Sequence, residues 1–241
     1  MAADPYSGPW GGRNCRDSPI QTKRNCSCGH DECEATDNFL KRSFEAVQKR
    51  AGLAICDEVQ TGFGRLGSHF WGFESQDAMP DIVTLAKGIG NGFPLGAVVT
   101  TEEIASSYGK ALYFNTYGGN PMATTVGKTV LEVIEEEKLQ ENCAVVGDYF
   151  LKQLSSIDSH LIGDVRGKGL MIGVELIDED GKPLTGDRLA SIFERIKDRG
   201  VLVGKGGLNG NVLRIKPPMC ITKQNVDTCV SAIADALKQG N

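Results

Sequence analysis

The sequence has little that points to a membrane or to a nucleic acid. No apolar run approaches the roughly 18 to 20 residues that a membrane helix needs. The 26 lysines and arginines are outnumbered by 31 aspartates and glutamates, which gives a net charge of −5. The basic residues are also scattered rather than gathered in a stripe, so we expect neither a membrane partner nor a nucleic-acid partner. The opening MAADPYSGPWGG lacks the pattern of a signal peptide and that of a transit peptide.

The chain is neither disordered nor a small disulfide-rich protein. Hydrophobic residues make up 40% and charged residues 24% of its 241 residues, which is an ordinary globular composition. This length predicts one large domain or slightly more. Glycine is abundant, with 30 residues, and 11 of them lie in residues 62–119. We expect many tight turns or close backbone approaches in that stretch.

The first part of the chain alternates predicted helices and buried strands. Residues 1–37 show no periodicity and are predicted to be irregular. Helices are predicted over 38–50, from Pro121 to about 137 and over 139–155; strands are predicted over 53–56, 81–86 and 95–100, with a loop over 58–80. A further helix is expected to start at Thr101. The short apolar strands predict a mostly parallel, helix-covered sheet over residues 38–155.

The pattern changes in the last third of the chain. Strands are expected within 162–177, 201–204 and 211–216, with helices over 186–199 and from Thr222 to Lys238. This order predicts an α+β domain over residues 156–241, and the whole chain is predicted to be an α/β protein with a second, smaller domain.

Two motifs suggest chemistry that their context does not support. GFGRLG at 62–67 has the spacing of a dinucleotide-binding loop, but no amphipathic helix follows it, so a turn-rich loop is favoured. Cys26, Cys28, His30 and Cys33, with Cys15 further away, are residue types that bind zinc. Their spacing is unlike the usual structural zinc sites, so a surface loop with reduced thiols is favoured over a metal site.

Asp57 and Lys87 form a more specific pair. Each ends a predicted strand and is followed by a glycine-rich loop. Lys87 is either desolvated, which lowers the pKa of an amine, or it extends its ammonium group to water. Asp57 alone could be an ordinary turn residue. An amine and a carboxylate together are what pyridoxal phosphate needs: the amine holds the aldehyde, and the acid keeps the ring nitrogen protonated.

Four other positions have both a structural and a functional interpretation. Thr116, in FNTYGGNP before a predicted helix, could contact a phosphate or could belong to a tight turn. Arg214, in VLRIKPP, could hold a substrate carboxylate or could be a surface residue. Arg166 and Lys168 are assigned a structural role.

Joined together, these motifs resemble the class III pyridoxal-phosphate aminotransferases. The resemblance is carried by AICDEVQTGFGRLGSHFWGFE, PDIVTLAKGIGNGFPLGAV, FNTYGGNPMA, GDVRGKGLMIGVEL and LRIKPPMCIT. It implies part of a fold type I large domain with a mostly parallel sheet, followed by an α+β C-terminal small domain. It also assigns the cysteine cluster to a family loop.

The resemblance implies a homodimer that uses pyridoxal 5′-phosphate to transfer an amino group from an amino acid such as alanine to a keto acid such as glyoxylate. Lys87 matches the lysine that bonds to the cofactor and moves protons. Asp57 matches the partner of the ring nitrogen, and Gln60 matches the residue near the ring hydroxyl. Thr116 matches a contact to the phosphate of the partner subunit's cofactor, and Arg214 matches the grip on the substrate carboxylate. A mitochondrial location is also implied.

The sequence departs from the family pattern before Asp57. It has no counterpart of the family's phosphate-binding Gly/Ser loop or of the aromatic residue that stacks on the ring. Between Cys33 and Asp57 a helix, a strand and a further helix are also missing. The chain is therefore expected to be a truncated form, and the alternative function is an inactive subunit that pairs with a full-length aminotransferase.

Overall fold

The computed structural model describes residues 2–3, 38–109 and 113–238. The described residues form two compact units. The first comprises residues 2–3, 38–64 and 69–140, and the second comprises residues 65–68 and 141–238. The candidate cysteine cluster at positions 15–33 and most of the segment predicted to be irregular lie outside the described residues.

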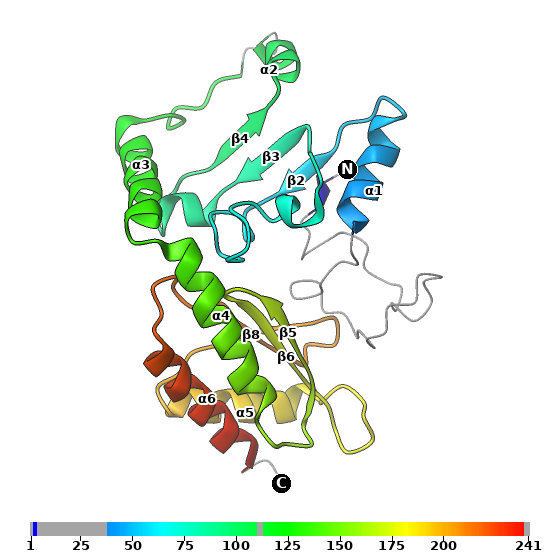
Figure 1. Ribbon diagram of the computed structural model, residues 1–241, viewed down its shortest axis with the longest axis vertical. Coiled ribbons are helices and arrows are strands. Elements are labelled where there is room, and N and C mark those ends of the chain that lie inside the picture. Colours follow the sequence, from blue (N-terminus) through cyan, green and yellow to red (C-terminus); the bar gives the residue numbers. More distant parts are fainter. Residues whose placement is uncertain (1, 4–37, 110–112, 239–241) are drawn as a thin grey trace. The chain divides into compact units, whose positions relative to one another are not determined.

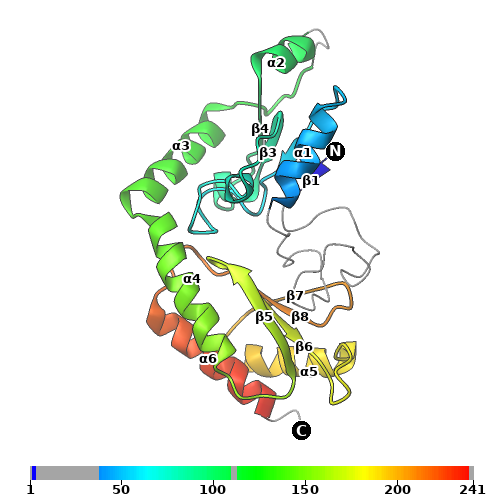
Figure 2. The same ribbon diagram turned by 45° about the vertical axis from the view of Figure 1, so that its right-hand side comes forward.

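The first unit contains a four-stranded sheet in the order β1-β2-β3-β4 (Figure 1). The strands are β1 (Ala2–Ala3), β2 (Ile55–Asp57), β3 (Ile82–Leu85) and β4 (Ala97–Thr100). β1, labelled in Figure 2, and β3 both pair with β2 in parallel. The predicted strands at 53–56 and 81–86 are therefore present and parallel, and Ala2–Ala3 adds a short strand inside the segment predicted to be irregular.

The predicted strand at 95–100 exists, but its direction and burial differ from the prediction. β4 runs antiparallel to β3, with Leu85 opposite Ala97. A parallel connection needs a crossover of about a dozen or more residues, usually through a helix, and residues 86–96 are too few for one. β4 is also not a buried strand, because Val98 and Val99 are 65% and 56% exposed.

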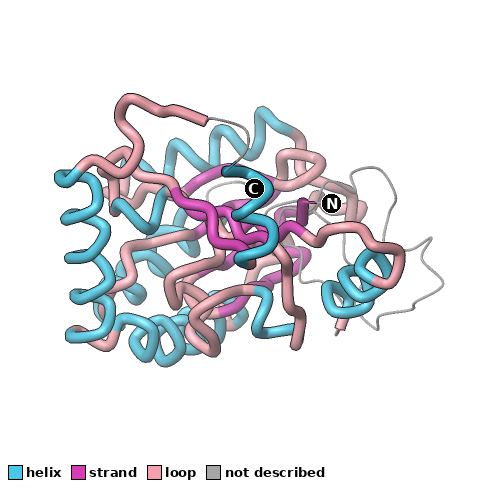
Figure 3. The backbone as a smooth tube through the Cα atoms, turned by 90° about the horizontal axis from the view of Figure 1, so that it is seen from above, coloured by secondary structure: helices cyan, strands magenta, loops and turns pink. Residues whose placement is uncertain are grey.

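Three helices accompany this sheet along the chain: α1 (Phe39–Gln48), α2 (Glu102–Tyr108) and α3 (Pro121–Glu136). The next helix, α4 (Leu139–Ser155), belongs to the second unit from Glu141 onward. The Thr101 hydroxyl caps α2 by accepting from the Ile104 N–H, and the Asn120 amide oxygen caps α3 by accepting from the Ala123 N–H. Loops and turns make up much of the chain between these elements (pink in Figure 3). The predicted helix positions are confirmed.

The second unit is an antiparallel sheet packed against three helices. Its strand order is β5-β6-β8-β7 (Figure 2). The strands are β5 (Ile162–Lys168), β6 (Met171–Leu176), β7 (Gly204–Gly206) and β8 (Val212–Ile215). The helices are α4, α5 (Gly186–Asp198) and α6 (Lys223–Lys238). The strand predicted at 201–204 begins later than predicted, at Gly204. The predicted helix cap is present, because the Thr222 hydroxyl accepts a hydrogen bond from the Asn225 N–H at 3.3 Å.

The core of the second unit lies between the helices and one face of the sheet. Cys143, Phe150 and Leu154 of α4 are completely buried there with Ile172 and Leu213 of the sheet. α4 therefore packs with the C-terminal elements of this unit. The division into domains 1–37, 38–155 and 156–241 remains a prediction.

Within the described ranges, no helix is long and apolar enough to cross a membrane.

Candidate active site

Asp57 and Lys87 follow neighbouring parallel strands at the same edge of the first sheet. Asp57 is the last residue of β2 and lies opposite Thr84 of β3, and Lys87 comes three residues after Thr84. Because β2 and β3 are parallel, both residues lie at the carboxyl end of the sheet, where α/β folds bind their ligands. Asp57 is half-buried, and its Oδ1 accepts a hydrogen bond from the Val59 N–H at 3.0 Å.

Lys87 begins a 3₁₀ helix, Lys87–Gly90, directly after β3. Its φ of 46° lies in the left-handed region, which a residue with a side chain rarely adopts. Lys87 is exposed, so its ammonium group reaches water, and the buried interpretation is excluded for this structure. Strained backbone at an exposed lysine on a ligand-binding edge is a feature of functional sites.

The turn that contains Lys87 packs against a cluster of aromatic side chains. A Cβ on Gly88 would lie 3.2 Å from the Phe63 ring, which is buried. Phe63 packs edge-on against Phe70 and Trp71, with ring centroids 5.9 and 5.2 Å away. α3 also packs against this turn, because a Cβ on its Gly127 would lie 3.6 Å from the Ile89 carbonyl oxygen. The position of Lys87 is therefore set by packing.

Glu58, directly after Asp57, is a key residue that the sequence analysis did not single out. Its carboxylate is completely buried and accepts hydrogen bonds from the Thr61 hydroxyl (2.6 Å) and from the Gly72 and Phe73 N–H groups (2.9 and 2.8 Å). These bonds close the loop that follows β2, so Glu58 shapes the backbone around Asp57 and Gln60. Gln60 is half-buried in this loop. The only feature of the sequence that could have revealed Glu58 was its position next to the candidate residue Asp57.

Thr116 lies exposed in the loop that leads into α3. The Asn115 Oδ1 accepts from the Tyr117 and Gly118 N–H groups, both at 3.0 Å, and the Asn120 Nδ2 donates to the Tyr117 carbonyl at 2.8 Å. Asparagine side chains thus hold the turn and leave the Thr116 side chain at the surface. Both interpretations of Thr116, a turn residue and a contact to a phosphate, remain compatible with this loop.

Arg214 belongs to the second unit and is described within it. It lies on β8 opposite Gly173 of β6 and Gly204 of β7, and Arg166 of β5 is also opposite Gly173. Opposite residues in antiparallel strands point to the same face, so the two arginines share the face that α4–α6 leave uncovered. A Cβ on Gly204 would lie 3.4 Å from the Arg214 Cβ, which is an ordinary contact distance.

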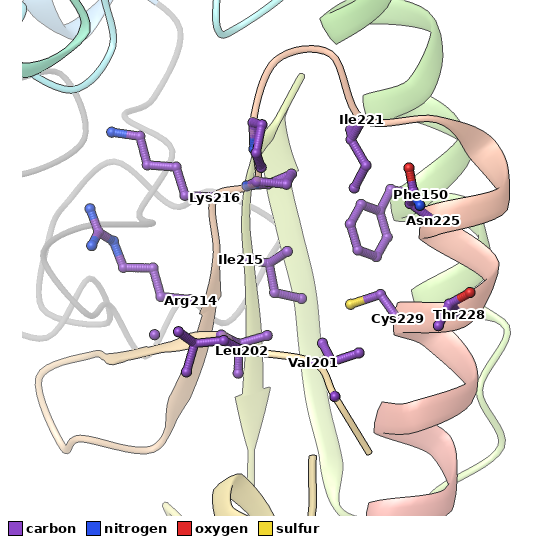
Figure 4. A pocket seen from close by; sticks show the side chains of 15 residues that line it. Phe150, Val201, Leu202, Arg214, Ile215, Lys216, Ile221, Asn225, Thr228 and Cys229 are labelled. Carbon is purple, nitrogen blue, oxygen red and sulfur yellow. The ribbon is translucent and has the colours of Figure 1, made fainter. Parts of the chain in front are cut away.

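The two arginines differ in their neighbours. The Arg166 Nη1 donates to Glu175 at 2.9 Å and to Asp164 at 3.0 Å. Burial by itself lowers the pKa of Arg166, but the hydrogen bonds and charges of Asp164 and Glu175 raise it overall. Arg166 therefore forms ion pairs with Asp164 and Glu175, in agreement with the structural role predicted for it. Arg214, in contrast, is half-buried and points away from the apolar side of the strand (Figure 4).

A pocket of about 640 Å³ surrounds the end of β8. Figure 4 shows Ile215 pointing toward Phe150 and Cys229, while Arg214 and Lys216 point the opposite way. The cationic ends therefore lie apart from the apolar lining. This pocket has the size of a small-molecule site, with charged groups at one edge.

The dinucleotide-binding interpretation of residues 62–67 finds no support in the structure, and the cysteine cluster at positions 15–33 lies outside the described residues. Gly62–Gly67 is followed by turns and a 3₁₀ helix, Phe73–Gln76, instead of the long helix of a dinucleotide-binding fold. No group of three or more metal-ligating side chains occurs in the part of the chain that the structure describes.

The residues of the first unit fit pyridoxal phosphate by their chemistry. An exposed primary amine and a half-buried carboxylate stand at one edge of a parallel strand pair. These groups would hold an aldehyde and a protonated ring nitrogen.

The chain is similar to proteins of one known family. Residues 33–237 match the family described as "Aminotransferase class-III". The chain is 48% identical to human "Alanine--glyoxylate aminotransferase 2, mitochondrial" over 99% of its own length and 55% of that protein. It is 54% identical to an Arabidopsis thaliana homologue of that enzyme, over 83% of this chain and 42% of the homologue. The chain thus spans about half the length of these relatives.

Solved structures show the same fold. An aminotransferase from Bacillus anthracis superposes with a TM-score of 0.81 and 36% identity, over 89% of this chain and 50% of that one. An amine transaminase from an uncultivated Pseudomonas species, solved with pyridoxal phosphate bound, gives a TM-score of 0.80 and 32% identity, over 90% of this chain and 51% of that one. The chain belongs to the class III aminotransferase family.

Proposed function

We propose that this chain is a pyridoxal-phosphate-dependent aminotransferase that transfers an amino group from an amino acid such as alanine to a keto acid such as glyoxylate. The observation that carries the proposal is the placement of Asp57 and Lys87 at the carboxyl edge of the parallel pair β2–β3. The names of the human and Arabidopsis relatives support the choice of substrates. Their names also support a mitochondrial location.

Each candidate residue has a role in this proposal. The bound cofactor supplies an electron sink that makes the substrate Cα proton acidic. Asp57 holds the ring nitrogen protonated, and Gln60 lies in the adjoining loop to contact the ring. The Lys87 Nζ would hold the cofactor aldehyde and, once the substrate amine has displaced it, would be free to accept the Cα proton. Arg214 binds the substrate carboxylate through its planar guanidinium group.

Turnover tests the proposal directly. The chain, loaded with pyridoxal phosphate and supplied with L-alanine and glyoxylate, is expected to form pyruvate and glycine. Lys87→Ala should abolish turnover, because no amine remains to hold the cofactor or to move the proton. Lys128→Ala, at an exposed lysine of α3, is the matched control and should retain it. A folded parent chain without turnover, or equal turnover in the two variants, would contradict the proposal.

A homodimer is part of the same proposal, and the loop before α3 supports it. The side chains of Phe114 and Tyr117 are 83% and 81% exposed, and Tyr113 and Met122 are also exposed. Clustered apolar side chains at a surface mark protein contacts. Thr116 lies between them and would thereby reach the phosphate of the cofactor bound by the partner subunit.

The same surface favours the second candidate, an inactive subunit that pairs with a full-length aminotransferase. The match to the human relative runs over 281 residues, which is 40 more than this chain has. At least that many positions of the relative within the match have no counterpart here. Co-expression with a full-length relative distinguishes the two: the inactive subunit forms a mixed complex and shows no turnover alone, whereas the enzyme turns over by itself.

A further inference from the structure

Arg65 lies in a four-residue segment, 65–68, that packs into the second unit. The Arg65 carbonyl accepts a hydrogen bond from the Leu170 N–H at 3.0 Å. Glycine lets the backbones touch at two points: a Cβ on Gly67 would lie 2.5 Å from the Ala144 backbone, and one on Gly169 would lie 2.5 Å from the Arg65 carbonyl oxygen. These close contacts between backbone atoms fix the position of the Arg65 backbone, from which its side chain extends.

The Arg65 side chain bridges two parts of the second unit. Its Nη1 donates to the Leu170 carbonyl, in the turn between β5 and β6, at 3.3 Å. The same nitrogen donates to the Pro217 carbonyl at 2.8 Å. Pro217 comes three residues after Arg214 and is followed by Pro218. Because proline has no N–H, these residues cannot continue the strand's hydrogen-bond ladder, and the Arg65 guanidinium holds the exit of β8 in place.

A cation in this position has an electrostatic cost. Burial lowers the pKa of the Arg65 guanidinium; Cys143 opposes this shift, and the charge of Arg214 adds to it. Two guanidinium groups that repel each other gain from an anion bound beside them. A guanidinium also offers a rigid fork of donors that reaches both carbonyls, which a lysine ammonium does not reproduce.

We propose that Arg65 is a positioning residue for Arg214: it clamps the Pro217 carbonyl and thereby fixes the strand end that carries Arg214. The inference rests on the proposed function, in which Arg214 binds the substrate carboxylate. The ligand group that this site would bind is the single carboxylate of an amino acid or a keto acid. The proposed function gives no role to Arg65 itself.

The test compares Arg65→Met and Arg65→Lys with the parent chain. Arg195→Met is the matched control, because the Arg195 Nε also donates to a backbone carbonyl, that of Ala236, at 3.1 Å within the same unit. In the loaded chain, the rate of the half-reaction is measured against L-alanine concentration. Arg65→Met should raise the concentration for half-maximal rate by about 10- to 100-fold, as expected for a misplaced orienting group, with the limiting rate within about twofold of the parent.

A second measurement does not depend on turnover. The Nε–Hε NMR signal of Arg214, assigned with Arg214→Lys, is titrated with acetate in the chain without cofactor. Acetate should bind the parent at Arg214 and bind Arg65→Met about tenfold more weakly. Arg65→Lys should lie in between, because an ammonium group can replace only part of the clamp on the two carbonyls. If the parent chain binds acetate at Arg214 but shows no turnover, that result contradicts the proposed function and leaves the Arg65 inference standing.

Three results would overturn the Arg65 inference: no acetate binding at Arg214 in the parent, unchanged binding in the Arg65 variants, or an equal loss in Arg195→Met. If Arg65→Met does not fold, Arg65→Lys decides, and an acetate affinity equal to that of the parent overturns the inference.

Discussion

At the scale of single residues, Glu58 shapes the loop that holds Asp57 and Gln60. Glu58→Ala removes a completely buried carboxylate and leaves the Gly72 and Phe73 N–H groups without their acceptor. Buried donors without acceptors are costly, so we expect the free energy of unfolding to fall by about 2 to 4 kcal/mol. Urea denaturation measures this change.

The control for Glu58 is Glu136→Ala, at an exposed acid in the last turn of α3. Surface substitutions of this kind change stability by less than about 0.5 kcal/mol. Equal losses in the two variants would show that the buried hydrogen bonds of Glu58 do not hold its loop.

Cysteine reactivity provides a prediction that depends on pH. Burial raises the pKa of the Cys143 and Cys229 thiols to about 11, although the charge of Arg65 opposes this at Cys143. The thiolate is the reactive form, and a raised pKa keeps both groups protonated until the pH approaches that value. At pH 8, iodoacetamide should therefore label exposed Cys220 and leave these two unmodified.

Peptide mapping by mass spectrometry reads the labelling at each cysteine, and urea-unfolded protein is the positive control, in which all three react. Labelling of Cys143 or Cys229 at the rate of Cys220 in the folded chain would contradict their burial.

The sequence pointed to some of these residues and not to others, for a physical reason. Lys87 and Asp57 stand out because each follows an apolar strand, a pattern that is local in the chain. Glu58 and Arg65 act through partners that are distant in sequence, at Gly72 and Phe73 for one and at Leu170 and Pro217 for the other. Such pairings depend on the folded chain and leave no periodic signal.

At the scale of elements, the contact of α4 with the turn between β5 and β6 depends on glycine. A Cβ on Gly147 would lie 2.3 Å from the Gly169 carbonyl oxygen, so the backbones are already in contact. Gly147→Ala should force the helix away and lower stability by about 1 to 3 kcal/mol, which is the usual cost of overpacking. Thermal unfolding measured by circular dichroism gives the comparison.

Gly186→Ala is the matched control, because Gly186 begins α5 and a Cβ there meets nothing within 4 Å. Alanine favours the helical conformation, so this variant should be neutral or more stable by up to about 1 kcal/mol. A destabilisation similar to that of Gly147→Ala would mean that the loss arises from helix propensity and not from the backbone contact.

The helices were predictable because caps and periodicity mark them locally. The predicted limits of α3 and α4 agree with the structure, and Lys138, with a φ of 52°, separates the two helices. Strand direction was harder, since a short apolar run reads the same in a parallel and an antiparallel pair. For β4, the length of the connection after Leu85 was the signal that could have revealed its direction.

At the scale of the whole molecule, the first unit combines a candidate cofactor edge with exposed apolar surface. Val98 and Val99 are neighbours on β4 and so point to opposite faces, yet both are exposed. Sheets of this architecture normally have both faces covered. Within the class III family, to which the chain belongs, the unit therefore presents surface that suits contact with further protein.

The central claim is that Lys87 holds pyridoxal phosphate. The most direct measurement is to incubate the folded chain with the cofactor, fix the linkage with borohydride, and map the modified peptide by mass spectrometry. The claim predicts one phosphopyridoxyl group on Lys87, its loss in Lys87→Ala and its retention in Lys128→Ala. Modification spread over surface lysines and unchanged in Lys87→Ala, or none on Lys87, would contradict it.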